Sequence, residues 1–181
     1  VITEEEHEEL VRLTESIDRE TRAAEEFLNN HLELTGPLAL PRKVKREIIN
    51  MKNYKPDKHV RLMRYDFHPT VEDKWAVSEV NSDVPGGLPE SSKLPLLAKK
   101  YLGYGEVKFD IADVLYKEFI KIDKDIKHVA FVHATSYADD RQVMQYVGDF
   151  FEEKGIKSSY VDPTALKFKE TKAYYQNELV D

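Results

Sequence analysis

The sequence contains no cysteine, which excludes a disulfide framework, a zinc–thiolate site and a thiol nucleophile. No apolar run approaches the ~20 residues that a membrane-spanning helix needs. The first residues contain neither the basic segment nor the apolar core of a signal peptide. The lack of cysteine favours a cytoplasmic protein. The chain also begins with Val1 instead of methionine, so we expect it to be a piece of something longer.

The charge balance excludes two further classes of function. A formal net charge of −7 argues against a general nucleic-acid or anionic-membrane surface, so neither is expected as a partner. Neither the G-x-S-x-G elbow of hydrolases nor the G-x-G-x-x-G fingerprint of dinucleotide binding occurs. Hydrophobic residues make up 41% of the 181 residues, enough for the core of one domain or two small ones.

The first fifty residues predict two helices. Thr3 and Glu6 fit a capping box, and apolar residues recur at helical spacing to about Leu32. Gly36-Pro37 breaks the chain. A second helix is expected from Pro41, and residues 53–58 are interpreted as a loop. The predicted buried stripe of this second helix consists of Val44, Ile48, Ile49 and Met51.

From residue 60 the apolar period changes from helical spacing to two, which predicts a β-hairpin over residues 60–67 and 74–81. With a two-residue turn at Glu72-Asp73, Asp66 lies directly opposite Glu79 on one face. Cross-strand Cβ atoms are then ~4.5–5.5 Å apart. Glu-Asp is not a favoured hairpin turn, so a register shifted by two residues is the alternative.

The rest of the chain predicts an α+β or α/β fold. We expect a short helix capped by Ser91-Ser92 and another helix beginning at Asp110. A charged connector over residues 123–127 is the expected boundary between domains at 1–125 and 126–181. Beyond it a Rossmann-like β-α-β lobe is predicted. Its elements are a strand at 129–132, a helix at 139–154, a strand at 156–161 and a final hairpin around Glu170-Thr171.

The candidate site lies in and after the first hairpin. Asp66, Glu79 and Asn81 offer oxygen ligands of the kind that Mg²⁺ prefers. Alternatively, the carboxylates face water or pair with nearby Arg and Lys side chains. Arg64 is placed either to hold a phosphate or carboxylate bidentately or to pair with Glu79.

The loop after the second strand and the loop before residue 138 are the other candidates. The loop after the second strand either clasps an anionic substrate through backbone N–H groups or is an ordinary loop. Its candidate residues are Ser82, Asp83, Gly86 and Gly87. Residues 133–137 follow a buried strand, where open α/β folds bind ligands. His133 is interpreted there as a strand-end histidine.

The pattern Arg64-x-Asp66 … Glu79-x-Asn81-x-Asp83-x-Pro85 resembles the glutathionylspermidine synthase-like, circularly permuted ATP-grasp ligases. The resemblance implies an ATP- and Mg²⁺-dependent ligase that joins a carboxylate to an amine through an acyl phosphate. Asp66, Glu79 and Asn81 would then bind Mg²⁺, and Arg64 would contact the transferred phosphate. Residues 126–181 would belong to the pre-ATP-grasp lobe.

The resemblance also implies what is missing here. The ATP-grasp lobe that clasps adenine would lie beyond Asp181, so we expect little ATP binding and no turnover from these residues alone. Gly86-Gly87 stands where such synthases often have Thr-Ser, so the carboxylate and amine substrates stay open. The alternative function is a non-catalytic binding or scaffold module that keeps the ligase architecture.

Overall fold

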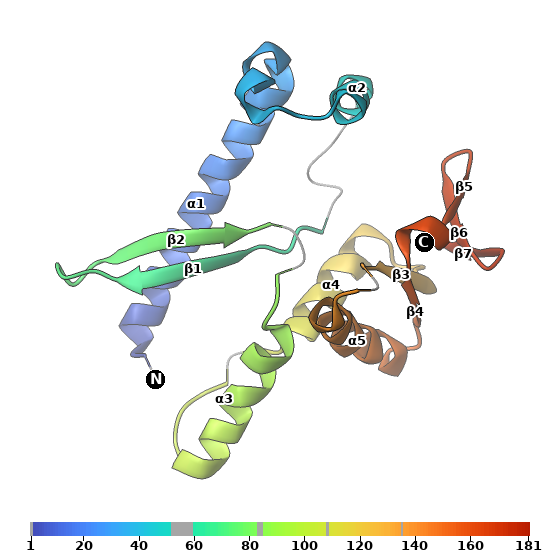
Figure 1. Cartoon of the computed structure of the whole chain (residues 1–181). Coiled ribbons are helices and arrows are strands. Elements are labelled where there is room, and N and C mark those ends of the chain that lie inside the picture. Colours follow the sequence, from blue (N-terminus) through green and yellow to red (C-terminus); the bar gives the residue numbers. More distant parts are fainter. Residues whose placement is uncertain (1, 52–59, 83–84, 108, 135) are drawn as a thin grey trace. The chain divides into compact units, whose positions relative to one another are not determined.

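The computed structural model describes residues 2–51, 60–82, 85–107, 109–134 and 136–181 (Figure 1). The chain divides into two compact units. The first combines residues 1–57 with 65–79, and the second combines residues 58–64 with 80–181. Among the described residues, no helix has both the length and the apolar character required to cross a bilayer.

The first unit begins with α1 (Glu4–Asn30), which starts at the predicted capping box. The Thr3 hydroxyl accepts from the Glu6 N–H at 3.2 Å, and the Glu6 carboxylate accepts from the Thr3 N–H at 2.7 Å. The helix is followed by η1 (Leu32–Leu38) and α2 (Arg42–Asn50).

The predicted buried stripe on α2 is wrong, because no residue of α2 is buried. Val44 is 43% exposed and Ile49 is 52% exposed. No residue of α1 is buried either. Helical periodicity thus predicted the helices correctly, while their apolar faces meet no covering neighbour among the described residues of the first unit.

The strands β1 (Arg64–Pro69) and β2 (Trp75–Asn81) form a two-stranded sheet. Most of this hairpin belongs to the first unit, while Arg64, Val80 and Asn81 belong to the second. The strand predicted to start at Val60 begins four residues later. The loop expected at 53–58 lies outside the described residues.

The second unit is built on a parallel pair, β3 (His128–Val132) and β4 (Lys157–Val161), with His128 opposite Lys157 and Val132 opposite Val161. The connection between them is α5 (Ala138–Glu153). Gly155 follows that helix with a φ of +84°, the left-handed conformation in which glycine often ends a helix.

The core of this unit lies where α5 covers the parallel pair. Phe151 is fully buried and makes edge-to-face contacts with Tyr116, Phe119 and Phe131, at centroid distances of 5.5–6.1 Å. Such contacts add to the stabilisation from buried area. Gly148 allows the close approach, because a Cβ there would lie 2.2 Å from the Tyr160 hydroxyl.

Two helices pack beside α5 in the same unit: α3 (Leu88–Leu102) and α4 (Ile111–Ile122). Asp110 caps α4 by accepting from the Ala112 N–H, at the predicted start of that helix. The predicted cap at Ser91-Ser92 is wrong, since α3 starts three residues earlier, after Gly87. Both serines lie inside the helix.

The chain closes with a meander of β5 (Lys167–Lys169), β6 (Lys172–Tyr175) and β7 (Glu178–Val180). The pairing of Lys169 with Lys172 confirms the predicted hairpin around Glu170-Thr171. The third strand was not predicted. The Asp181 carboxylate next to it accepts from the N–H groups of Lys127 and His128, which ties the meander to β3.

The mixed α+β class is confirmed by these elements. A two-stranded parallel sheet is smaller than a Rossmann-like half, so that finer class stays a prediction. The division at 125/126 also stays a prediction.

Candidate functional site

Arg64 and Gly86 are brought together, although 22 residues separate them. Nη1 of Arg64 donates to the Gly86 carbonyl oxygen at 3.1 Å. A Cβ on Gly86 would lie 3.8 Å from that nitrogen. Two of the predicted site residues therefore meet where β1 begins, and the guanidinium orientation is linked to the loop before α3.

The loop from Pro85 to Gly87 is fixed by its backbone. Pro85 and Leu88 are buried on either side of the two glycines. Gly87 is the N-cap of α3 and has a φ of +84°, which glycine adopts without steric cost. Its carbonyl accepts from the Ser91 N–H at 2.9 Å. A substitution at Gly87 would therefore strain the start of α3.

The turn between β1 and β2 differs from the predicted two-residue turn. The Thr70 N–H donates to the Lys74 carbonyl at 2.7 Å, and the Asp73 N–H donates to the Thr70 carbonyl at 3.2 Å. Asp73 has a φ of +55°. These features define a three-residue loop, a tight turn followed by a left-handed residue.

The longer turn shifts the register by one residue. With Thr70 paired to Lys74, Asp66 lies opposite Ser78, whose hydroxyl donates to the Asp66 carbonyl at 3.1 Å. A one-residue shift moves every side chain of a strand to the other face. Asp66 and Glu79 therefore lie on opposite faces of the hairpin, and the predicted shared face is wrong.

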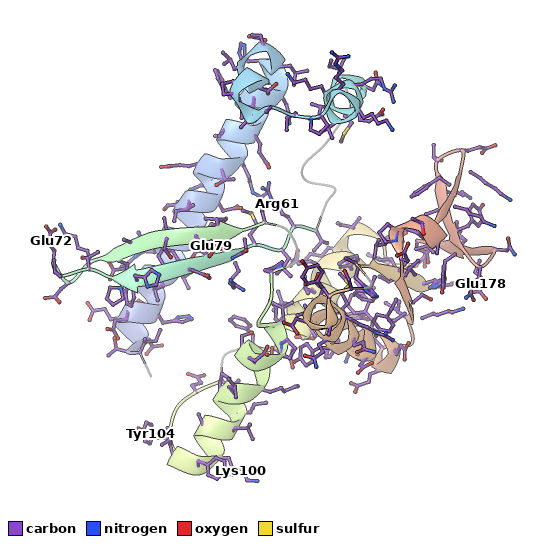
Figure 2. All side chains as sticks on the ribbon, viewed as in Figure 1. Arg61, Glu72, Glu79, Lys100, Tyr104 and Glu178 are labelled. Carbon is purple, nitrogen blue, oxygen red and sulfur yellow. The ribbon has the colours of Figure 1, made fainter. Side chains whose placement is uncertain are left out.

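The observed register has a physical reason. It places Tyr65 and Phe67 on the same face as Trp75 and Val77, and Arg64, Asp66 and His68 on the other. The predicted register would have mixed these two sets. Glu79, which is labelled on the hairpin in Figure 2, follows Val77 in alternation and is exposed.

Asn81 is the next residue on the Glu79 face of β2 by strand alternation. Its Nδ2 is buried and has no hydrogen-bond partner among the described residues. A buried amide group of this kind costs free energy until it meets a partner. Ser82 is exposed, and Asp83 lies outside the described residues.

The predicted three-ligand Mg²⁺ set does not fit this geometry, because the Asp66 side chain points away from the face of Glu79. Within the described ranges, no group of three His, Asp or Glu side chains is placed to hold a metal ion. Glu79 and Asn81 alone offer one carboxylate and one amide oxygen from the same strand face.

Sequence reasoning missed a polar cluster that fixes α3. The Asp110 carboxylate accepts from the Tyr146 hydroxyl at 2.6 Å and from Lys93 Nζ at 3.0 Å. Lys93 Nζ also lies 5.1 Å from the centre of the Tyr146 ring. The buried Ser92 hydroxyl accepts from the Ile111 N–H at 3.2 Å.

These contacts set the charge state of the cluster. Burial acts to raise the pKa of Asp110, but the hydrogen bonds from Tyr146, Lys93 and the Ala112 N–H outweigh it and hold that pKa below its usual value. The hydrogen bond to Asp110 in turn raises the pKa of Lys93. An acidic N-cap 17 residues after a lysine was the available signal, but the spacing did not reveal the pair.

The loop after β3 contains a buried histidine. His133 is 7% exposed, and its N–H donates to the Val161 carbonyl at 3.1 Å. Its Nδ1 lies 3.2 Å from the Ala134 carbonyl oxygen. This placement agrees with a strand-end histidine. Thr135 of the same loop lies outside the described residues.

Comparison with protein families adds one finding. The family described as "Glutathionylspermidine synthase preATP-grasp" matches residues 1–180. Comparisons with curated proteins and with solved structures gave no match. The match extends over both compact units and includes the Arg64–Gly86 contact. The chain therefore belongs to the glutathionylspermidine synthase pre-ATP-grasp family.

Proposed function

We propose that this chain is the pre-ATP-grasp part of an ATP-dependent ligase that joins a carboxylate to an amine. The family match over residues 1–180 supports the ligase class. The observation that carries the site assignment is the hydrogen bond from Arg64 to the Gly86 carbonyl. It holds a cation beside a loop whose two glycines leave the backbone open.

The proposed chemistry has two steps. An oxygen of the substrate carboxylate attacks the terminal phosphorus of ATP, and the bond to the ADP oxygen breaks, giving an acyl phosphate. The amine nitrogen then attacks the acyl carbon, phosphate leaves with its bonding electrons, and the nitrogen loses a proton. Arg64 is proposed to stabilise the negative charge on the transferring phosphoryl group.

The loop residues are proposed to bind the substrates. The backbone N–H groups of Gly86 and Gly87 are suited to a carboxylate or phosphate, because glycine has no side chain of its own to hinder a close approach. Ser82 and Asp83 are proposed to contact the same substrates. The remaining ATP-grasp lobe, C-terminal to this chain, is the proposed partner for the nucleotide.

Mg²⁺ accompanies ATP in this type of reaction, but the three-residue ligand set of Asp66, Glu79 and Asn81 does not fit the hairpin register. Of these residues, Glu79 and Asn81 would hold the ion together with nucleotide phosphates, as Mg²⁺ sites with few protein ligands do. When bound, the ion would neutralise phosphate charge. The Arg64 role does not depend on it.

The test is Arg64→Ala in the full-length protein, with Arg46→Ala, an exposed arginine of α2, as the matched control. Removing a donor that stabilises transition-state charge lowers kcat by about 10²-fold. We expect such a loss of ATP-dependent ligation for Arg64→Ala and none for the control. Unchanged ligation by Arg64→Ala would contradict the proposal.

A non-catalytic scaffold is the second candidate, and the observation that favours it is the separation of Asp66 from Glu79 on opposite hairpin faces. Asp66→Asn and Glu79→Gln in the full-length protein discriminate the two. If Glu79 is a ligand and Asp66 is not, only Glu79→Gln lowers Mg²⁺-dependent ATP turnover. If the parent protein shows no turnover even before substitution, the scaffold function stands. The 181-residue chain alone is expected to turn over no ATP.

A further inference from the structure

The C-terminal part of α3 is exposed on all sides and presents several large apolar side chains to solvent. The helix is anchored near its start by the buried residues Leu88 and Ser92, and every residue from 93 to 102 is exposed. In Figure 1 this end of α3 extends away from α4 and α5. The large apolar side chains exposed there are Leu94 (57%), Leu96 (48%), Leu97 (51%), Tyr101 (84%) and Leu102 (48%).

Three of these side chains share one face. Leu94, Leu97 and Tyr101 are spaced by three and four residues, the spacing of a seam between two packed helices. Glu90 lies one helical turn before Leu94 on this face, and Lys100 lies at the edge of the face. We call Glu90, Leu94, Leu97 and Tyr101 the α3 stripe. Exposed apolar patches of this kind mark interaction sites.

The charges at the two ends of the α3 stripe are opposite. Glu90 lies at its N-terminal end, and Lys100 lies near its C-terminal end. Lys93, the other cation on this side, is already hydrogen-bonded to Asp110 and lies over the Tyr146 ring. The stripe is therefore complementary to itself when a second α3 runs in the opposite direction.

We propose that the α3 stripe binds the α3 stripe of a second copy of this chain, in antiparallel orientation. With the two-fold axis between Pro95 and Leu96, Leu94 of each copy lies opposite Leu97 of the other. Glu90 then lies opposite Tyr101 of the other copy and beside its Lys100. Both helices satisfy the same contacts, as a closed two-fold interface requires.

A second copy explains the pattern better than an unrelated partner. An unrelated helix would need a complementary stripe of its own, while here apolar residues pair at the centre and opposite charges meet at both ends of one sequence. A single helix pair buries less than the ~800 Å² per partner of a standard interface. The dimer is therefore expected to be weak and concentration-dependent.

The test is sedimentation equilibrium of the 181-residue chain from micromolar to hundreds of micromolar concentration. We expect a monomer–dimer equilibrium with no larger species. Leu97→Glu weakens the dimer at least ~10-fold, because it places one carboxylate in each of the two central leucine contacts. The matched control is Leu96→Glu, which lies outside the α3 stripe, about 100° around the helix from Leu97, and is similarly exposed; it leaves the equilibrium unchanged.

A charge exchange tests the orientation. Glu90→Lys and Lys100→Glu each weaken the dimer, since each places like charges at both ends of the seam. The double variant Glu90→Lys/Lys100→Glu restores it. Circular dichroism of every variant verifies that the helices are retained.

Three results would overturn the proposal: a monomer at all concentrations, equal effects of Leu97→Glu and Leu96→Glu, or a ladder of larger species. None of these outcomes depends on ligase activity, so failure here and failure of the proposed function are separate.

Discussion

The two compact units contain similar apolar patterns but bury them to different extents. In the second unit, α5 places Val143, Val147 and Phe151 in a closed core with exposures of 8% or less. In the described part of the first unit, Thr35 is the one buried residue, and Phe27 on α1 stays 53% exposed. In the second unit, α3, α4 and α5 pack against one another beside the parallel pair, while among the described elements the long α1 packs mainly on the adjacent η1.

The difference teaches what helical periodicity measures. A stripe at i, i+3 and i+4 predicts that a segment is helical and that one face prefers an apolar neighbour. It does not say that the neighbour is present in the same unit. Most helical stability in proteins comes from packing of that face, so the second unit should be much the more stable of the two.

The largest expected effect comes from one matched pair of phenylalanines. Phe151→Ala removes a fully buried ring with three aromatic neighbours and should destabilise the second unit by ~3–5 kcal/mol. Phe27→Ala removes a half-exposed ring and should cost much less. Chemical denaturation with a probe in each unit measures both; similar losses would break the comparison.

Gly148 tests how tightly the core of the second unit is packed where α5 contacts the parallel pair. Gly148→Ala places a Cβ 2.2 Å from the Tyr160 hydroxyl and 3.3 Å from the Phe131 ring. The Tyr160 ring is stacked on Phe131 with centroids 5.7 Å apart, so it has little room to move. Overpacking of this type costs ~1–3 kcal/mol.

A second substitution tests whether the clash with the Tyr160 hydroxyl causes the loss of stability. Tyr160→Phe removes the closest atom, so the double variant Gly148→Ala/Tyr160→Phe should recover part of the lost stability. Strict additivity of the two single changes would argue against the steric explanation.

Asp110 links α3 and α4 to α5 in the second unit, and its lowered pKa makes this stabilisation depend on pH. Because the folded state lowers that pKa, the stabilisation is present above the usual value of 3.8 and is lost as pH falls through the folded pKa. Asp110→Asn should remove this part of the acid dependence and cost about 1–2 kcal/mol at neutral pH. Acid titrations of both proteins followed by thermal melting test this; parallel curves below pH 4 would contradict it.

The elements that sequence predicted well are those governed by local chemistry. The α1 capping box, the Asp110 cap of α4 and the Glu170-Thr171 hairpin all depend on residues within a few positions of one another. The third strand of the meander was missed because its turn, Gln176-Asn177, has positive φ at both residues without the usual glycine.

The roles of the candidate site residues stay predictions, and the structure tests only how some of these residues are placed. The proximity of Arg64 to Gly86 agrees with a shared motif, but the faces of Asp66 and Glu79 depended on the length of a turn. The hydrogen bond between Thr70 and Lys74 closes a three-residue loop, whereas the prediction assumed a two-residue turn. One additional residue in the turn decides which side chains share a face. The alternation of apolar residues along each strand does not reveal the length of the turn between the strands.

The smallest expected effect lies at the start of the first unit, in the capping box of α1. Thr3→Ala removes the hydroxyl that accepts from the Glu6 N–H and should cost the helix about 1 kcal/mol. The Thr3 N–H and hydroxyl lower the pKa of Glu6, so the contribution of the carboxylate is present at neutral pH and is lost in acid. Because α1 buries no residue, the loss should stay local. Amide exchange should rise in the first turn of α1 and stay unchanged in α5. Faster exchange throughout the second unit would mean that the stability of α5 depends on α1, and the contrast between the two units would then fail.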